Sequence, residues 1–199
     1  MVSLVTQERA LVCHPQTPTQ SVSTMQARLS QSDDGAIAIT YLIKGQISRV
    51  LLPVKSTPSR VDRLWQHTCF EAFLAVKSTP AYREFNFAPS GQWAAYAFER
   101  YRMGGPLPEA SDPRITARSY ENRFELDAII RRESLPAMPV NAHLLLSLSA
   151  VIEEQNGILS YWALNHPPGP PDFHHASGFV LEIDPHVAAI IDPAYTSKR

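Results

Sequence analysis

Residues 64–102 read LWQHTCFEAFLAVKSTPAYREFNFAPSGQWAAYAFERYR and contain three runs in which side chains alternate between two sets. Alternation with a period of two is typical of β-strands, because successive side chains point to opposite faces of a sheet. Residues 77–79 and 88–91 separate these runs and have the composition of turns. The three runs are therefore predicted to form neighbouring antiparallel strands.

The same pattern recurs along most of the 199-residue chain, with the 17 prolines mostly between the runs. Many short strands at regular spacing predict an all-β fold, an antiparallel two-sheet β-sandwich of the jelly-roll or immunoglobulin-like kind. At most one short helix is expected, over residues 127–133, and no linker divides the chain, so residues 1–199 are taken as a single domain. The expected strands are 2–13, 22–29, 36–43, 48–53, 67–76, 82–88, 93–101, 115–120, 124–129, 143–152, 159–164 and 179–183.

The charge balance limits the kinds of binding partner that are expected, because the chain has 18 Lys and Arg side chains and 19 Asp and Glu side chains. A net charge of -1 argues against binding nucleic acid or a membrane surface through a basic field. The sequence has no run of about 18 apolar residues and begins without a secretory pattern. Cys13 and Cys69 are too few for a disulfide framework or a four-thiolate zinc site. A cytoplasmic protein is expected, of unspecified oligomeric state.

Polar side chains gather on one face of the three central strands. Glu71 is expected opposite Glu84 or Asn86, depending on a two-residue shift in register. A turn centred on residues 88–91 pairs Asn86 with Trp93 and leaves small alanines beside them. The opposite face, expected to belong to the core, carries Phe85, Phe87, Tyr96 and Phe98.

Two carboxylates, an amide and an indole on one face suit a shallow sugar site. Sugar hydroxyls need hydrogen-bonding partners, and an indole stacks on the apolar side of a pyranose ring. The alternative is a solvated outer face, which antiparallel sheets normally show. A hydrolytic enzyme using Glu71 and Glu84 is a further alternative, since glycosidases need two carboxyl groups about 5–9 Å apart.

The segment 166–175, HPPGPPDFHH, is rich in proline and stiff. His166, Asp172, His174 and His175 are weak candidates for a metal site, although their spacing matches no zinc signature. The other interpretation is a rigid loop that closes the sandwich, with Asp172 and His174 capping backbone groups.

A hairpin about Asn156-Gly157 is predicted to precede this loop. It pairs Trp162 with Val151, which favours a core role for Trp162.

The runs LWQHTCFEAF (64–73) and YREFNFAPSGQW (82–93) resemble the bacterial DOMON-like proteins, which are similar to carbohydrate-binding modules of family nine. YWALNHP (161–167) and PDFH (171–174) are also typical of that group, and the resemblance is clearest over residues 64–179. It implies a β-sandwich that binds a ligand rather than catalyses a reaction. Sugar-binding relatives clamp a ring between tryptophans, here Trp65 and Trp93. Haem-binding relatives use a methionine ligand, for which Met103 is the best-placed residue.

The expected function is therefore a non-catalytic module that binds a carbohydrate or a similar hydroxylated small molecule. No cofactor is required, although neither haem nor a metal ion is excluded. A structural or interaction module without a small-molecule ligand is the remaining alternative. Arg102 and the 166–175 loop are candidates for the rim of the site. The expected ligand-binding residues are Trp65, Glu71, Glu84, Asn86, Trp93 and Arg102.

Overall fold

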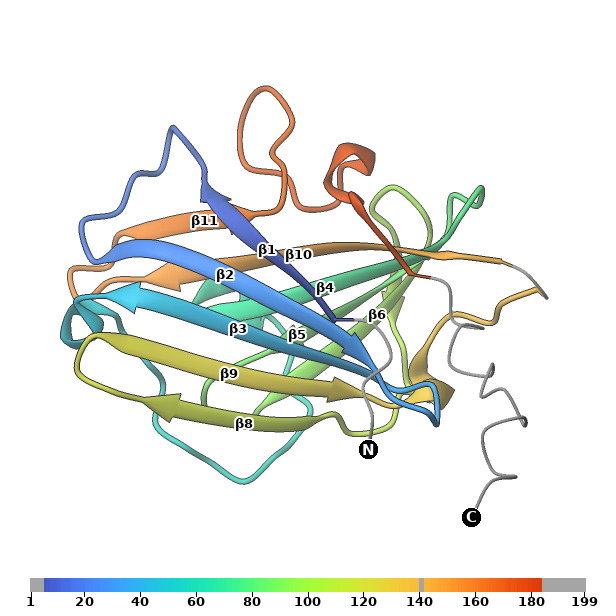
Figure 1. Ribbon diagram of the computed structural model, residues 1–199, viewed down its shortest axis with the longest axis horizontal. Helices are drawn as coiled ribbons and strands as arrows, with labels where there is room; N and C mark the ends of the chain where they lie inside the picture. Colours follow the sequence, from blue (N-terminus) through green and yellow to red (C-terminus); the bar gives the residue numbers. More distant parts are fainter. Residues whose placement is uncertain (1–5, 140–141, 184–199) are drawn as a thin grey trace, which may run out of the picture.

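The computed structural model describes residues 6–139 and 142–183, and its regular secondary structure consists almost entirely of antiparallel strands (Figure 1). The prediction of an all-β sandwich is confirmed. The strands are β1 Thr6–Cys13, β2 Val22–Gln31, β3 Ile37–Gly45, β4 Cys69–Val76, β5 Tyr82–Phe87, β6 Trp93–Arg100, β7 Met103–Pro106, β8 Arg114–Ser119, β9 Arg123–Ile130, β10 Leu144–Glu153, β11 Leu159–Ala163 and β12 Leu181–Ile183. Short 3-10 helices are η1 Ile47–Arg49, η2 Leu64–Gln66, η3 Arg132–Ser134 and η4 Ala176–Gly178. Within the described ranges, no helix has the length and apolar character needed to span a membrane.

The strands form two layers that lie face to face (Figure 1). One layer, the β3 sheet, has the order β1-β2-β3-β9-β8, and the other, the β4 sheet, has the order β7-β6-β5-β4-β10-β11. The end of β1 joins the two layers, because Val12 and Cys13 pair with Ala163 and Trp162 of β11. β12 pairs with the start of β10.

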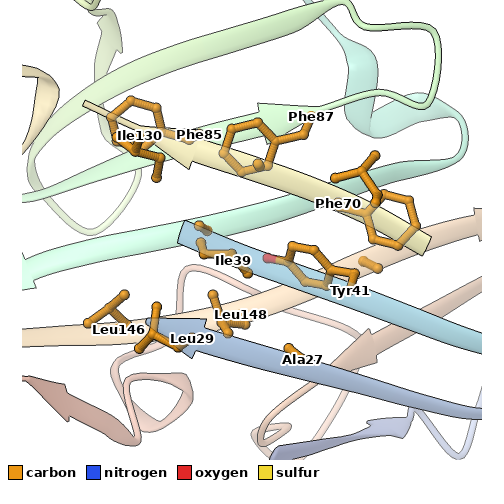
Figure 2. Packing of buried hydrophobic residues seen from close by; sticks show 14 of the residues in the cluster. Ala27, Leu29, Ile39, Tyr41, Phe70, Phe85, Phe87, Ile130, Leu146 and Leu148 are labelled. Carbon is orange, nitrogen blue, oxygen red and sulfur yellow. The ribbon is translucent and has the colours of Figure 1, made fainter. Parts of the chain in front are cut away.

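Alternate side chains of both sheets fill the space between the layers, as Figure 2 shows for Ile39 and Tyr41 of β3 and for Phe70 of β4. The outward-facing residues of β3 are only half buried up to Leu42, as expected for a face near solvent. In β4, by contrast, every residue is buried on both faces. The outer face of β4 itself is therefore covered by neighbouring side chains.

Tyr41 links the two layers, because its buried hydroxyl donates a 2.7 Å hydrogen bond to the main-chain oxygen of Glu71. Replacing Tyr41 with phenylalanine removes this bond and keeps the ring, so we expect the free energy of unfolding to fall by about 1 kcal/mol. Urea unfolding measures this change. Tyr120→Phe, at an exposed ring, is the matched control and should leave stability unchanged; equal values for both variants would contradict the structural role of the bond.

The register predicted for the β5–β6 hairpin is wrong by one residue. Asn86 pairs with Ala94, while Trp93 pairs with Phe87. The Ala88 N–H donates to the Gln92 oxygen at 2.9 Å, so the connection is a three-residue loop that ends at Gly91 with φ of 93°. Such a loop is a turn followed by one left-handed residue, and its odd length moves each β6 side chain to the other face.

The β10–β11 hairpin differs from its prediction in the same way. The Glu154 N–H donates to the Ile158 oxygen at 2.8 Å, and Gly157, with φ of 81°, ends a three-residue loop. Trp162 consequently pairs with Ala150 rather than Val151. Its predicted core role is confirmed, since it is buried between the sheets.

Two other expectations need correction, and one strand was not expected. The helix predicted over residues 127–133 is wrong, because β9 continues to Ile130 with alternating buried side chains and only Arg132–Ser134 is helical. The strand predicted over 48–53 is replaced by η1 and an isolated bridge at Val50. The short strand β7 was not predicted from the sequence.

Candidate ligand-binding site

A cavity of about 390 Å³ lies on the outer face of the β4 sheet. Strand residues form its floor, and residues from the connections between elements form its rim. The lining residues are Trp65, Glu71, Glu84, Tyr96, Phe98, Arg102, Val151, Tyr161, Pro171, Phe173 and His174.

The register of the sheet explains which residues meet there. Glu71 pairs with Asn86 on one side and with Ser149 on the other, as one of the two predicted registers required. Glu84 pairs with Tyr96 in the adjacent row. Paired residues point to the same face, so acidic and aromatic side chains share the outer face of the sheet.

The segment that follows β11 (orange in Figure 1) supplies Pro171, Phe173 and His174 to the cavity lining and so covers part of this face. Its prolines stiffen it, and Asp172 anchors it. The Asp172 carboxylate accepts hydrogen bonds from the Tyr101 hydroxyl at 2.7 Å and from the Arg102 guanidinium at 2.8 Å. It also accepts from the His174 main-chain N–H at 3.1 Å. Burial opposes ionisation, but the bonds from Tyr101 and Arg102 prevail and lower the pKa of Asp172.

Arg102 sits in the β6–β7 turn with φ of 54°, a left-handed conformation that costs a non-glycine residue energy. This conformation directs its main-chain N–H to the Tyr82 hydroxyl at 3.0 Å. The Tyr82 hydroxyl lies 2.8 Å from His174 Nδ1, so the turn, the sheet and the covering segment are tied together. Burial and the charge of Arg102 lower the pKa of His174 to about 4, which makes this ring neutral at pH 7.

The Glu71 and Glu84 side chains are buried in the floor of the cavity, with 3% and 5% of their surfaces exposed. Glu84 Oε1 accepts a 2.7 Å hydrogen bond from the Asn86 amide, and Glu84 Oε2 lies 3.7 Å from His174 Nε2. Glu71 Oε1 is buried without a hydrogen-bond partner among the described residues, and so is the Oγ of Ser149.

Burial raises the pKa values of both carboxyl groups, because charge is unfavourable away from water. Burial and the neighbouring charge of Glu84 raise the pKa of Glu71 well above its usual range. Burial raises the pKa of Glu84 to about 7, against the opposing effects of Asn86 and Arg102. Both carboxyl groups therefore keep their protons to a higher pH than exposed glutamates do.

Of the six expected site residues, Trp65, Glu71, Glu84 and Arg102 line the cavity. Asn86 is fully buried beneath it and orients Glu84. Trp93 does not line the cavity, because the register of β6 places it in the core, where its ring packs 4.6 Å from the Arg60 guanidinium carbon.

The same register brings in residues that the sequence analysis missed. Tyr96 and Phe98, expected in the core, line the cavity, as do Tyr161 and Phe173. Gly91 and Gly157, left-handed at the ends of three-residue loops, set the register that brings Tyr96, Phe98 and Tyr161 to this face, and the sequence letters alone also fit the shorter turns that were predicted.

The four residues considered for a metal site each form other contacts. His166 Nε2 lies 2.8 Å from the Val12 main-chain oxygen, and His175 caps η4 by accepting from the Ser177 N–H. Asp172 and His174 serve the anchoring contacts described above. Among the described residues, no group of three or more His, Cys, Asp or Glu side chains is arranged to hold a metal ion.

Met103, the residue considered for haem, is half exposed in β7. Its Sδ lies 2.8 Å from Arg100 Nε, and it does not line the cavity.

No family model matches the sequence, and a comparison with curated proteins finds no match. Among solved structures, a proposed carbohydrate-binding protein from Bacteroides uniformis is similar, with a TM-score of 0.57, 16% identity and coverage of 87% of this chain and 84% of that one. A family 9 carbohydrate-binding module from Caldicellulosiruptor kristjanssonii, in complex with cellotriose, has a TM-score of 0.51, 11% identity and coverage of 82% and 74%. At these identities the likeness establishes the fold.

Proposed function

We propose that this protein is a non-catalytic carbohydrate-binding module that holds a small saccharide in the cavity above the β4 sheet. The observation that carries the proposal is the lining of this one cavity. Aromatic rings, two buried carboxyl groups and an arginine converge on it. A sugar ring requires this combination, because it presents apolar C–H faces and hydroxyl groups together.

The position of each residue in the cavity sets the contact that it would make with a sugar. Trp65, on η2, keeps 45% of its surface exposed at the rim, which suits an indole that stacks on a sugar ring. Glu71 and Glu84 in the floor accept or donate hydrogen bonds, and Arg102 adds a fixed donor group. The volume is near the small end of the about 300–1,000 Å³ range of ligand pockets, which favours a short saccharide.

The comparisons with solved structures support this proposal. Solved structures with a similar fold include one named as a carbohydrate-binding protein and one in complex with cellotriose. Membership of the DOMON-like group remains a prediction.

Trp65→Ala tests the proposal in a calorimetric titration with glucose and cellobiose. We expect the wild type to bind at least one of them and the variant to bind at least about tenfold more weakly, because the stacking surface is lost. Tyr120→Ala, at an exposed ring outside the cavity, is the control and should bind as the wild type does.

The rival functions give different results with the same samples. Turnover of nitrophenyl glycosides that Glu84→Gln abolishes would replace the non-catalytic proposal with a hydrolase. A strong visible absorption band lost in Met103→Ala would indicate a haem module. No heat change with any saccharide would leave an interaction module as the better interpretation.

A further inference from the structure

The floor of the cavity holds two carboxyl groups on adjacent strands. Glu71 and Glu84 face the same side of the sheet from diagonal positions, because Glu71 pairs with Asn86 and Glu84 lies two residues away on β5. Diagonal neighbours are close enough for their side chains to share one ligand group. Both carboxyl groups are more than nine-tenths buried and both line the cavity.

One oxygen atom of this pair forms no hydrogen bond. Glu71 Oε1 is buried without a hydrogen-bond partner among the described residues. Ser149 pairs with Glu71 from β10, and its Oγ is also buried without a hydrogen-bond partner among the described residues. Buried polar atoms of native proteins are nearly always bonded, so two adjacent unbonded ones indicate a place for a ligand group.

The basic groups nearest to this pair are engaged elsewhere. The Arg102 guanidinium is bonded to Asp172 at 2.8 Å and to the Tyr101 hydroxyl at 3.3 Å. His174 is neutral at pH 7 and lies 3.7 Å from Glu84 Oε2. In the part of the chain that is described, neither carboxylate forms a hydrogen-bonded ion pair with arginine or lysine.

Buried carboxylates without a bonded cation are unfavourable, which is why the pKa values of Glu71 and Glu84 are raised. A ligand that brings its own positive charge removes this penalty. The cavity walls suit a cation as well, because the faces of Tyr96, Phe98 and Phe173 attract positive charge.

We infer, on the basis of the proposed function, that the saccharide carries a protonated amine, as an amino sugar does, and that its ammonium group binds between Glu71 and Glu84. The ammonium group donates up to three hydrogen bonds, one of them to Glu71 Oε1. The sugar ring then lies against Trp65 and the other rings. A hydroxyl in place of the amine carries no charge, and an N-acetyl group is both neutral and larger.

Calorimetric titration at pH 7 with glucosamine, glucose and N-acetylglucosamine tests this inference. We expect glucosamine to bind at least about tenfold more tightly than the two neutral sugars, as a charge-assisted contact in a buried site should. Glu71→Gln and Glu84→Gln should each reduce that preference to less than about threefold. Glu121→Gln, at an exposed position between β8 and β9, is the matched control and should keep it.

The outcomes separate the two proposals. If the wild type binds the two neutral sugars as tightly as glucosamine, the amine inference is overturned and the carbohydrate-binding function stands. If it binds none of the three but binds cellobiose, the amine inference is again overturned and the carbohydrate-binding function stands. If it binds neither these three sugars nor cellobiose, both proposals fail. Because the selectivity is measured on the wild-type protein, a variant that does not fold leaves the test intact.

Discussion

Trp93→Ala is expected to lower the free energy of unfolding by about 3–5 kcal/mol, the usual cost of removing a buried aromatic ring. Trp93 has only 2% of its surface exposed and belongs to the core between the sheets. Its ring also packs against the Arg60 guanidinium, and its main chain bonds to Ser59 and Val61 at 3.0 and 2.8 Å. The variant therefore loses packing both in the core and against the segment that leads to η2.

Chemical unfolding followed by far-ultraviolet circular dichroism measures this effect. Trp65→Ala is the matched comparison, because it removes the same side chain from an exposed position and should change stability by less than about 0.5 kcal/mol. Trp93→Ala should thus lose stability, whereas Trp65→Ala should lose sugar binding. A Trp93→Ala protein of normal stability that fails to bind sugar would instead place Trp93 in the site.

The contrast between these two tryptophans shows how far the sequence predicts the site. Strand positions follow from alternation, and the same alternation places Glu71 and Glu84 on one face whichever of the two predicted registers applies. The face of β6 depends on one further fact, the number of residues in the loop before it. A four-residue turn and a three-residue loop with a left-handed glycine fit the same letters, and they give opposite faces to Trp93.

The covering segment marks a second limit. Its prolines predict a rigid loop, and Asp172 does accept a main-chain hydrogen bond there, from His174. The hydrogen bond that anchors this segment joins Asp172 to Arg102, 70 positions apart in the chain. No local periodicity relates two such residues, because their proximity depends on the whole order of the strands in the β4 sheet.

Glu84→Gln should change the pH dependence of stability, because burial raises the pKa of Glu84 from 4.5 to about 7 in the folded protein. Between these values the folded state holds a proton that the unfolded chain has lost. Stability from this group is therefore complete below about pH 4.5 and falls by about 1.4 kcal/mol per pH unit up to about pH 7, by about 3 kcal/mol in total.

His174 acts in the opposite direction, since burial and Arg102 lower its pKa from 6.5 to about 4 in the folded protein. The unfolded chain then binds the extra proton, so stability rises with pH between about 4 and 6.5. The two groups offset each other over much of this range in the wild type. The informative quantity is therefore the difference between wild type and Glu84→Gln, in which the contribution of His174 largely cancels.

We expect this difference in unfolding free energy, wild type minus Glu84→Gln, to fall by about 3 kcal/mol between pH 4.5 and 7.5. Glutamine retains the oxygen that accepts from Asn86, so the hydrogen bond in the floor can persist without the charge. The substitution also removes the negative charge that raises the pKa of Glu71, which acts in the same direction. Urea unfolding at pH 4.5, 5.5, 6.5 and 7.5 measures the trend. A constant difference for Glu84→Gln would mean that Glu84 ionises as a solvated carboxylate does, and the buried acidic floor would then lose its physical basis.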